Sequence, residues 1–125
     1  MDLTPHHLGI VVSDLERSKA FYRALGFDQV SERVAEDKTL SFLRLGPLQL
    51  ELFWYREPVP AAEVPARVLG FKHLALETHD IDAAFAELRA AGVLPEGAAI
   101  REIPPDWRLL FFNDPDGVEI EIKQA

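Results

Sequence analysis

Apolar and polar residues alternate in several short stretches of the chain, and two longer stretches repeat apolar residues at helical spacing. Alternation sends successive side chains to opposite faces of a strand, whereas recurrence at every third or fourth residue gives a helix one apolar face. Helices are predicted to follow Asp14 and Asp80, which suit the N-cap position, and to end at Gly26 and Gly92. Strands are predicted at residues 7–13, 27–34, 39–45, 48–55, 71–78, 98–103, 108–112 and 118–123.

The two halves of the chain carry this pattern in the same order. One constant offset in residue number converts His7 to His73 and Asp14 to Asp80, and it aligns the apolar residues between them. Two copies are too few for a solenoid, which needs at least three stacked repeats. The repeat therefore predicts two copies of one supersecondary unit that close around a shared centre.

Each copy is predicted to contain one strand, one helix and three further strands. The fold class is therefore α+β, with two βαβββ modules at residues 1–55 and 71–125 whose curled mixed sheets form a metal-containing cleft. Residues 56–70 contain three prolines and show no clear period. Proline lacks the backbone donor that regular structure needs, so this segment is predicted to be the linker of a single domain.

Composition excludes several classes of function. A net charge of −8 argues against nucleic acid, where phosphate neutralisation supplies most of the affinity. No apolar run approaches the roughly 20 residues of a membrane span, and the first residues do not resemble a secretory signal. Cysteine is absent, which excludes thiolate metal ligands and a cysteine nucleophile. A cytoplasmic protein that acts on a small molecule is expected.

Four polar side chains occupy equivalent places in the two modules. His7 and His73 open the first strand of each module, and Glu51 and Glu121 lie in its last strand. The apolar neighbours of each glutamate face the helix, so both carboxylates point to the opposite face. Two imidazoles and two carboxylates suit one divalent ion, Ni²⁺, Zn²⁺ or Co²⁺, with Mn²⁺ and Fe²⁺ also suited. The repeat predicts that all four residues bind such a metal.

Each of these four residues, taken singly, would more often be an ordinary surface residue. The prediction of a metal site depends on their equivalent positions in the two modules. His6 has no histidine counterpart, since Lys72 stands there, and it is expected on the surface, facing away from His7. Further candidates for substrate contact are expected on the walls or at the mouth of the cleft. These are Phe53, Tyr55, Glu77, Trp107 and Arg108.

With these four positions identified, the sequence resembles the vicinal-oxygen-chelate superfamily and, within it, the glyoxalase I (lactoylglutathione lyase) branch. The resemblance covers nearly the whole chain and is carried by HLGIVVSDLERSKAFYRALGF, LQLELF and, most specifically, FFNDPDGVEIEI. It implies Glu121 as the carboxylate that shuttles a proton, with Glu51 as the second catalytic carboxylate. It also implies a homodimer with shared active sites, while pairing within one chain stays open.

The leading hypothesis is a metal-dependent lyase or isomerase that acts on an α-hydroxycarbonyl or thiohemiacetal-type small molecule through an enediolate. An Fe²⁺-dependent extradiol-type dioxygenase, which would leave Glu51 without a ligand role, is the first alternative. A non-catalytic small-molecule-binding protein is the second. Val11 and Tyr55 stand where bacterial glyoxalase I carries its glutathione-binding arginine and asparagine, which argues against glutathione as the thiol carrier.

Overall fold

The computed structural model of the chain describes residues 1–61 and 69–125, which fall into two compact units with a boundary after Ala61. Residues 62–68, part of the predicted linker, lie outside the described residues, and residues 58–61 have no regular secondary structure. The predicted division of one domain into 1–55, 56–70 and 71–125 stays a prediction. None of the described helices has the length and apolar character needed to cross a membrane.

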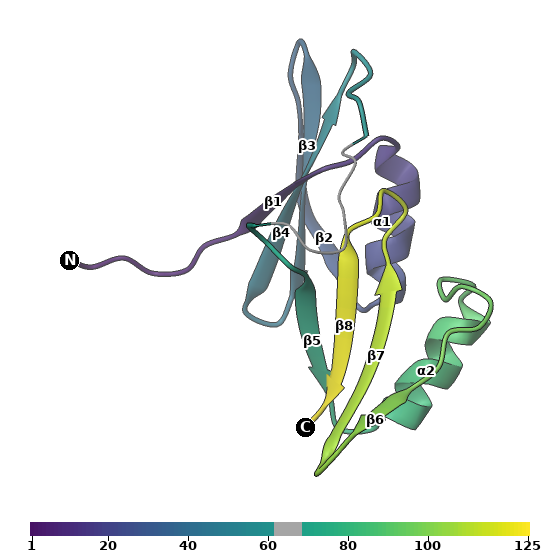
Figure 1. Ribbon diagram of the computed structural model, residues 1–125. Coiled ribbons are helices and arrows are strands. Elements are labelled where there is room, and N and C mark those ends of the chain that lie inside the picture. The colour runs from purple at the N-terminus through teal and green to yellow at the C-terminus, as the bar shows by residue number, and fades with distance from the viewer. Residues whose placement is uncertain (62–68) are drawn as a thin grey trace. The chain divides into compact units, whose positions relative to one another are not determined.

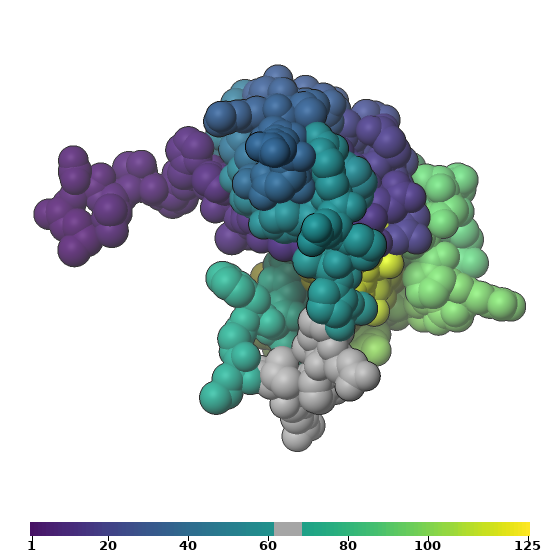
Figure 2. Space-filling view, turned by 90° about the horizontal axis from the view of Figure 1, so that it is seen from above, coloured from purple at the N-terminus to yellow at the C-terminus, as the bar shows by residue number. Residues whose placement is uncertain are grey.

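The first unit is a four-stranded mixed sheet with one helix on it (Figure 1). Its strand order is β1-β4-β3-β2, in which β1 runs parallel to β4 and the other neighbours are antiparallel. Residues before β1 extend away from this sheet (Figure 2). The elements are β1 (Leu8–Val11), α1 (Leu15–Ala24), β2 (Asp28–Val34), β3 (Lys38–Leu45) and β4 (Leu48–Tyr55).

The second unit repeats this topology. Its strand order is β5-β8-β7-β6, with β5 parallel to β8 and the remaining pairs antiparallel. The elements are β5 (Leu74–Thr78), α2 (Ile81–Ala90), β6 (Arg101–Ile103), β7 (Trp107–Asn113) and β8 (Glu119–Gln124). The α+β class and the two βαβββ modules predicted from the sequence are therefore confirmed.

Both helices begin at the predicted N-cap residues. The Asp14 carboxylate accepts a hydrogen bond from the Arg17 amide, and Asp80 accepts one from the Ala83 amide, both at 3.0 Å. Each helix is followed by a glycine with positive φ, Gly26 at 101° and Gly92 at 74°, as its predicted end requires. Local sequence thus sets the bounds of both helices.

The helix-covered face of each sheet buries large apolar side chains. In β4, Leu50 and Leu52 are fully buried. In the second unit Ile120 of β8 and Leu110 of β7 are equally buried. Each such side chain stabilises its unit by roughly 1.5–3 kcal/mol, and because strands alternate, the same burial directs Glu51 to the other face.

Three predicted strands are shorter than expected. The strand predicted at 7–13 is paired only over β1, that at 71–78 only over β5, and that at 98–103 only over β6. A strand extends only as far as its neighbour offers backbone partners, and β1 pairs with four residues of β4, Leu50 to Phe53. His7 and His73 therefore lie directly before the paired strands.

The turn before β8 is built around one buried carboxylate. Asp114 is 5% exposed, and its Oδ1 accepts from the amides of Asp116 (2.9 Å) and Val118 (2.8 Å). Gly117 has a φ of 94°, a conformation that glycine adopts without strain. This turn fixes where β8 begins and therefore where its glutamates point.

Candidate metal centre

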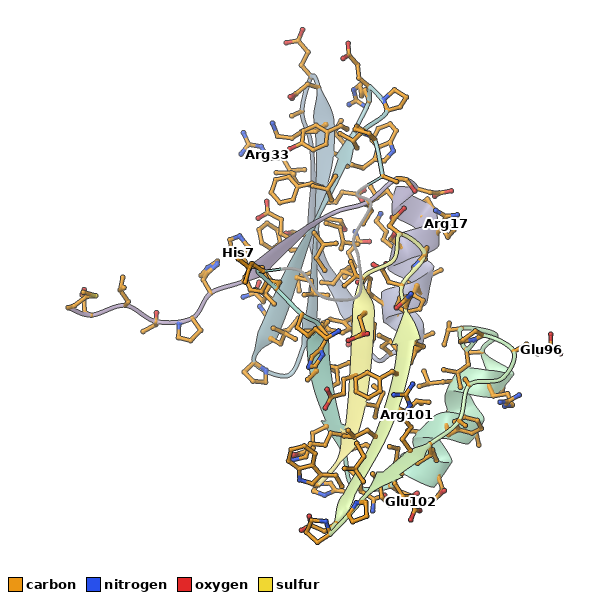
Figure 3. The ribbon with its side chains drawn as sticks, in the orientation of Figure 1. His7, Arg17, Arg33, Glu96, Arg101 and Glu102 are labelled. Carbon is orange, nitrogen blue, oxygen red and sulfur yellow. The ribbon has the colours of Figure 1, made fainter. Side chains whose placement is uncertain are left out.

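The first predicted ligand pair lies together at one end of the parallel β1–β4 ladder. Gly9 of β1 is the register partner of Glu51, and His7 stands two residues before it (Figure 3). The Nε2 of His7 lies 2.8 Å from Oε2 of Glu51, whose side chain is only 10% exposed. The sequence prediction that these two side chains share a face is therefore met within the first unit.

Gly9 lets the Phe53 ring lie against the β1 backbone, where a larger residue would crowd it. A Cβ added at Gly9 would lie 3.1 Å from Cε2 of Phe53, closer than carbon atoms normally approach. Phe53 stacks on Tyr55, with ring centroids 6.5 Å apart and planes 20° apart. The Glu51 face of β4 thus carries Phe53 two residues after Glu51, with Tyr55 stacked on Phe53.

The second predicted pair has the same geometry. Ala75 of β5 is the register partner of Glu121, and His73 again stands two residues earlier. The Nε2 of His73 lies 2.9 Å from Oε2 of Glu121, and the glutamate side chain is 13% exposed. Each unit therefore assembles one imidazole and one carboxylate in the same arrangement.

An aromatic ring supports each histidine. The rings of His7 and Phe42 pack edge to face with centroids 5.5 Å apart, and those of His73 and Phe111 lie 6.0 Å apart. Phe42 is the cross-strand partner of Glu51, and Phe111 occupies the equivalent place opposite Glu121. Neither phenylalanine was predicted from the sequence, although strand alternation around the buried Ser41 and Leu43 would have placed Phe42 on this face.

The second ring nitrogen differs between the two histidines. Nδ1 of His73 lies 3.2 Å from Oε1 of Glu119, which also lies 3.4 Å from Nζ of Lys72. Nδ1 of His7 lies 2.7 Å from Nδ1 of His6. His6 is exposed, as expected, but its ring turns toward His7, so the expected orientation away from His7 is wrong.

These donor sets fit a divalent ion. Metal–nitrogen and metal–oxygen bonds of about 2.1 Å place neighbouring ligands of an octahedron roughly 3.0 Å apart, and those of a tetrahedron roughly 3.4 Å apart. The two Nε2–Oε2 distances, 2.8 and 2.9 Å, are those of His–Glu hydrogen bonds and also lie near the octahedral edge. Within residues 1–61 and 69–125, no three His, Asp or Glu side chains form a group that could hold a metal. Neither pair is a complete site alone.

The other candidate residues lie in different places. Glu77 follows Ala75 on the same face of β5 and is exposed. Trp107 is 54% exposed, and Nζ of Lys123 lies 5.8 Å from its ring centroid. Phe53 and Tyr55 adjoin the first pair, as described above. The substrate roles of these residues stay predictions.

Arg108 is engaged on the helix-covered face of its sheet. Its guanidinium donates two hydrogen bonds to Asp82 of α2, at 2.8 and 3.1 Å, and one to Glu102 at 3.1 Å. The hydrogen bond from Arg108 holds the pKa of the Asp82 carboxyl below its usual value. Strand alternation puts Arg108 opposite the face of Phe111, which does not favour the predicted substrate role.

Comparison with known proteins adds the family context. A family model described as the Glyoxalase/Bleomycin resistance protein/Dioxygenase superfamily matches residues 4–122. The chain is 43% identical to the uncharacterized protein YaeR of Escherichia coli, over 94% of this chain and 92% of YaeR. It is 27% identical to human mitochondrial methylmalonyl-CoA epimerase, over 96% of this chain and 73% of the epimerase. A solved glyoxalase family protein from Enterococcus faecalis superposes with a TM-score of 0.79 at 28% identity, over 96% of each chain.

Proposed function

The chain belongs to the glyoxalase/bleomycin resistance protein/dioxygenase superfamily, and we propose that it is a divalent-metal-dependent lyase or isomerase of glyoxalase type. Its substrate is a small α-hydroxycarbonyl compound or thiohemiacetal. One observation carries the proposal: two His–Glu pairs, one in each module, hold Nε2 and Oε2 at 2.8 and 2.9 Å. The repeated topology places this donor pair at equivalent positions in both modules, which supports a shared ligand role.

The proposed ligands are His7, Glu51, His73 and Glu121. One ion, Ni²⁺, Zn²⁺ or Co²⁺, with Mn²⁺ and Fe²⁺ as further candidates, would supply a Lewis acid that polarises a substrate carbonyl oxygen. An ion held by these four side chains would still be able to bind two vicinal oxygens of the substrate. Because each module supplies two of the four proposed ligands, and no group of three was found within residues 1–61 and 69–125, the proposed site would need both modules, either of one chain or of two chains in a homodimer.

Glu121 is the proposed proton shuttle, and Glu51 is its symmetric counterpart. Each carboxylate is nearly buried and has one oxygen on a histidine, so its second oxygen is the atom available to a substrate C–H. Removal of that proton leaves an enediolate, and return of the proton to the neighbouring carbon completes an isomerisation. The hydroxyl carbon is thereby oxidised and the carbonyl carbon reduced, so the substrate undergoes no net change in oxidation state and no external oxidant or reductant is needed.

The first unit favours an apolar substrate portion next to its ligand pair. Phe42, Phe53 and Tyr55 line the Glu51 face, and none of them carries a charge that would hold a glutathione carboxylate. Val11, 49% exposed, likewise offers no such charge. A thiol carrier other than glutathione, or a substrate without a thiol, follows from this. The cytoplasmic location stays a prediction.

An epimerase is the second candidate function. The chain is similar to methylmalonyl-CoA epimerase and to a 2-epi-5-epi-valiolone epimerase of Actinomyces, at 27% and 29% identity. Epimerisation next to a carbonyl begins with the same proton removal, so the same four residues serve it. The dioxygenase alternative has less support, since it leaves Glu51 without a role while Glu51 contacts His7. A non-catalytic binding protein would show no turnover.

The test uses full-length protein stripped with chelator and reloaded separately with Ni²⁺, Co²⁺, Zn²⁺, Mn²⁺ and Fe²⁺. Thiol adducts of methylglyoxal, 2-substituted malonyl thioesters and catechols are the substrates, and NMR in D₂O follows exchange of the proton on the α-carbon. We expect exchange with at least one of the first two classes. The Glu121→Gln variant should lose about 100-fold or more in rate, whereas Glu96→Gln, on an exposed loop (Figure 3), should not.

The outcomes separate the candidate functions. Oxygen uptake with a catechol and Fe²⁺, without proton exchange on the other substrates, would replace the lyase with the dioxygenase. Full turnover by Glu121→Gln would remove its role as the base. Protein that takes up none of the five ions would refute a metal-dependent function.

A further inference from the structure

We infer that Glu119 positions His73 for metal binding, so that the two histidine ligands of this protein are electrostatically unequal. The inference rests on the proposed function, since it concerns how strongly a proposed ligand binds its ion. It does not depend on which substrate is used. Glu119 would act through His73 and would not itself contact the metal or the substrate.

The geometry around His73 carries the inference. Its imidazole has Nε2 2.9 Å from Glu121 and Nδ1 3.2 Å from Glu119, so each ring nitrogen faces a carboxylate of β8. The two glutamates lie two residues apart on one strand and therefore on one face. When Nε2 binds a cation, the only ring proton left is on Nδ1, and Glu119 is the carboxylate in reach to accept it.

This contact fixes both the tautomer and the orientation of the ring. An acceptor on Nδ1–H holds Nε2 as the free nitrogen, and the negative charge of Glu119 makes that nitrogen a stronger donor to a cation. Lys72, 3.4 Å from the same carboxylate oxygen, holds Glu119 near this position. Phe111 limits the ring from another side.

The equivalent place in the first unit lacks this charge. Gln49 stands two residues before Glu51, as Glu119 stands two residues before Glu121, and its amide is neutral. Nδ1 of His7 faces Nδ1 of His6 instead. An imidazole neighbour can share one proton with His7, but it brings no fixed negative charge. His73 is thus the more strongly polarised ligand, and the second module should anchor the ion.

The experiment measures metal affinity without any substrate. Chelator-stripped wild type, Glu119→Gln, Glu119→Asp and Glu96→Gln are titrated with Ni²⁺ and Co²⁺ in competition with a chromophoric chelator. Glu119→Gln keeps size and an acceptor but removes the charge, and it should weaken binding about 10- to 100-fold. Glu119→Asp should recover part of that loss. Glu96→Gln removes one charge from an exposed loop of the same unit and should stay within about twofold of wild type.

A second measurement separates positioning from folding. In Zn²⁺-loaded protein, ¹⁵N–¹H spectra should show a slowly exchanging Nδ1 proton on one histidine, and this proton should exchange faster in Glu119→Gln. Thermal unfolding of the metal-free variants should match wild type, because the Glu119 side chain is 31% exposed.

Each outcome decides between the two claims. If wild type binds metal and Glu119→Gln binds it equally well, the inference fails and the proposed function stands. If affinity falls only together with metal-free stability, Glu119 is structural and the inference fails. If wild type binds none of the ions, the proposed function fails and the inference fails with it.

Discussion

The buried Asp114 carboxylate holds the turn before β8, the strand that carries Glu121 of the second ligand pair. Asp114→Ala removes the acceptor for two backbone amides, those of Asp116 and Val118. Hydrogen bonds to a charged group each contribute roughly 1.5–3 kcal/mol. Asp116 is exposed, so water can satisfy part of the loss there. We expect the free energy of unfolding to fall by about 2–4 kcal/mol.

Two matched variants sharpen this prediction. Asp114→Asn keeps an acceptor but loses the charge, and it should lower the free energy of unfolding by about half as much as Asp114→Ala. Asp106→Ala removes an exposed aspartate from another turn of the same unit and should change stability by no more than about 0.5 kcal/mol. Urea unfolding followed by circular dichroism measures all three. A loss below about 1 kcal/mol for Asp114→Ala would refute the view that this carboxylate holds the turn.

Further expectations concern the first unit and metal loading. Ser18 of α1 is fully buried and its hydroxyl has no hydrogen-bond partner among the described residues, so Ser18→Ala should raise stability by about 1 kcal/mol in urea unfolding. Burial of Lys19 lowers its pKa, but hydrogen bonds to Glu32 and Glu16 outweigh this, so its net pKa is raised above 10.5. The contact therefore contributes its whole stabilisation below about pH 10.5, and this stabilisation is lost as the pH rises through the raised pKa of Lys19. Lys19→Met should remove this loss of stability at alkaline pH, measured by thermal unfolding at a series of pH values. A metal at 100 times its dissociation constant should stabilise wild type by about 2.7 kcal/mol, and an unchanged melting temperature would contradict binding.

Much of the fold could be predicted because its determinants are local. Asp14 and Asp80 cap their helices through an amide three residues away, and Gly26 ends the first helix by its own backbone conformation. Burial of Leu50 and Leu52 forces Glu51 to the other face of β4. Each of these effects acts within a few residues, so a pattern along the chain is enough to reveal it.

The pattern along the chain could not predict contacts between side chains on different strands and helices. Arg108 was predicted near the mouth of a cleft, yet it binds Asp82, 26 positions earlier, on the helix-covered face. The substrate role of Arg108 was predicted from its chemistry and not from its strand face, and it stays a prediction. Phe111, three residues further along β7, lies on the ligand face and was not predicted to contact His73.

Periodicity and the repeat were sufficient to name His7, Glu51, His73 and Glu121 as two equivalent pairs. They could not reveal that Glu119, 46 positions after His73, approaches its Nδ1. That contact depends on the parallel register of β5 with β8 and on the rotamers of both side chains. Alternation along a strand assigns a face to each residue, whereas neighbours on that face are chosen by how distant strands align. The sequence repeat alone therefore determined that the two pairs are equivalent. Only the folded structure shows that Nδ1 faces Glu119 in His73 and His6 in His7.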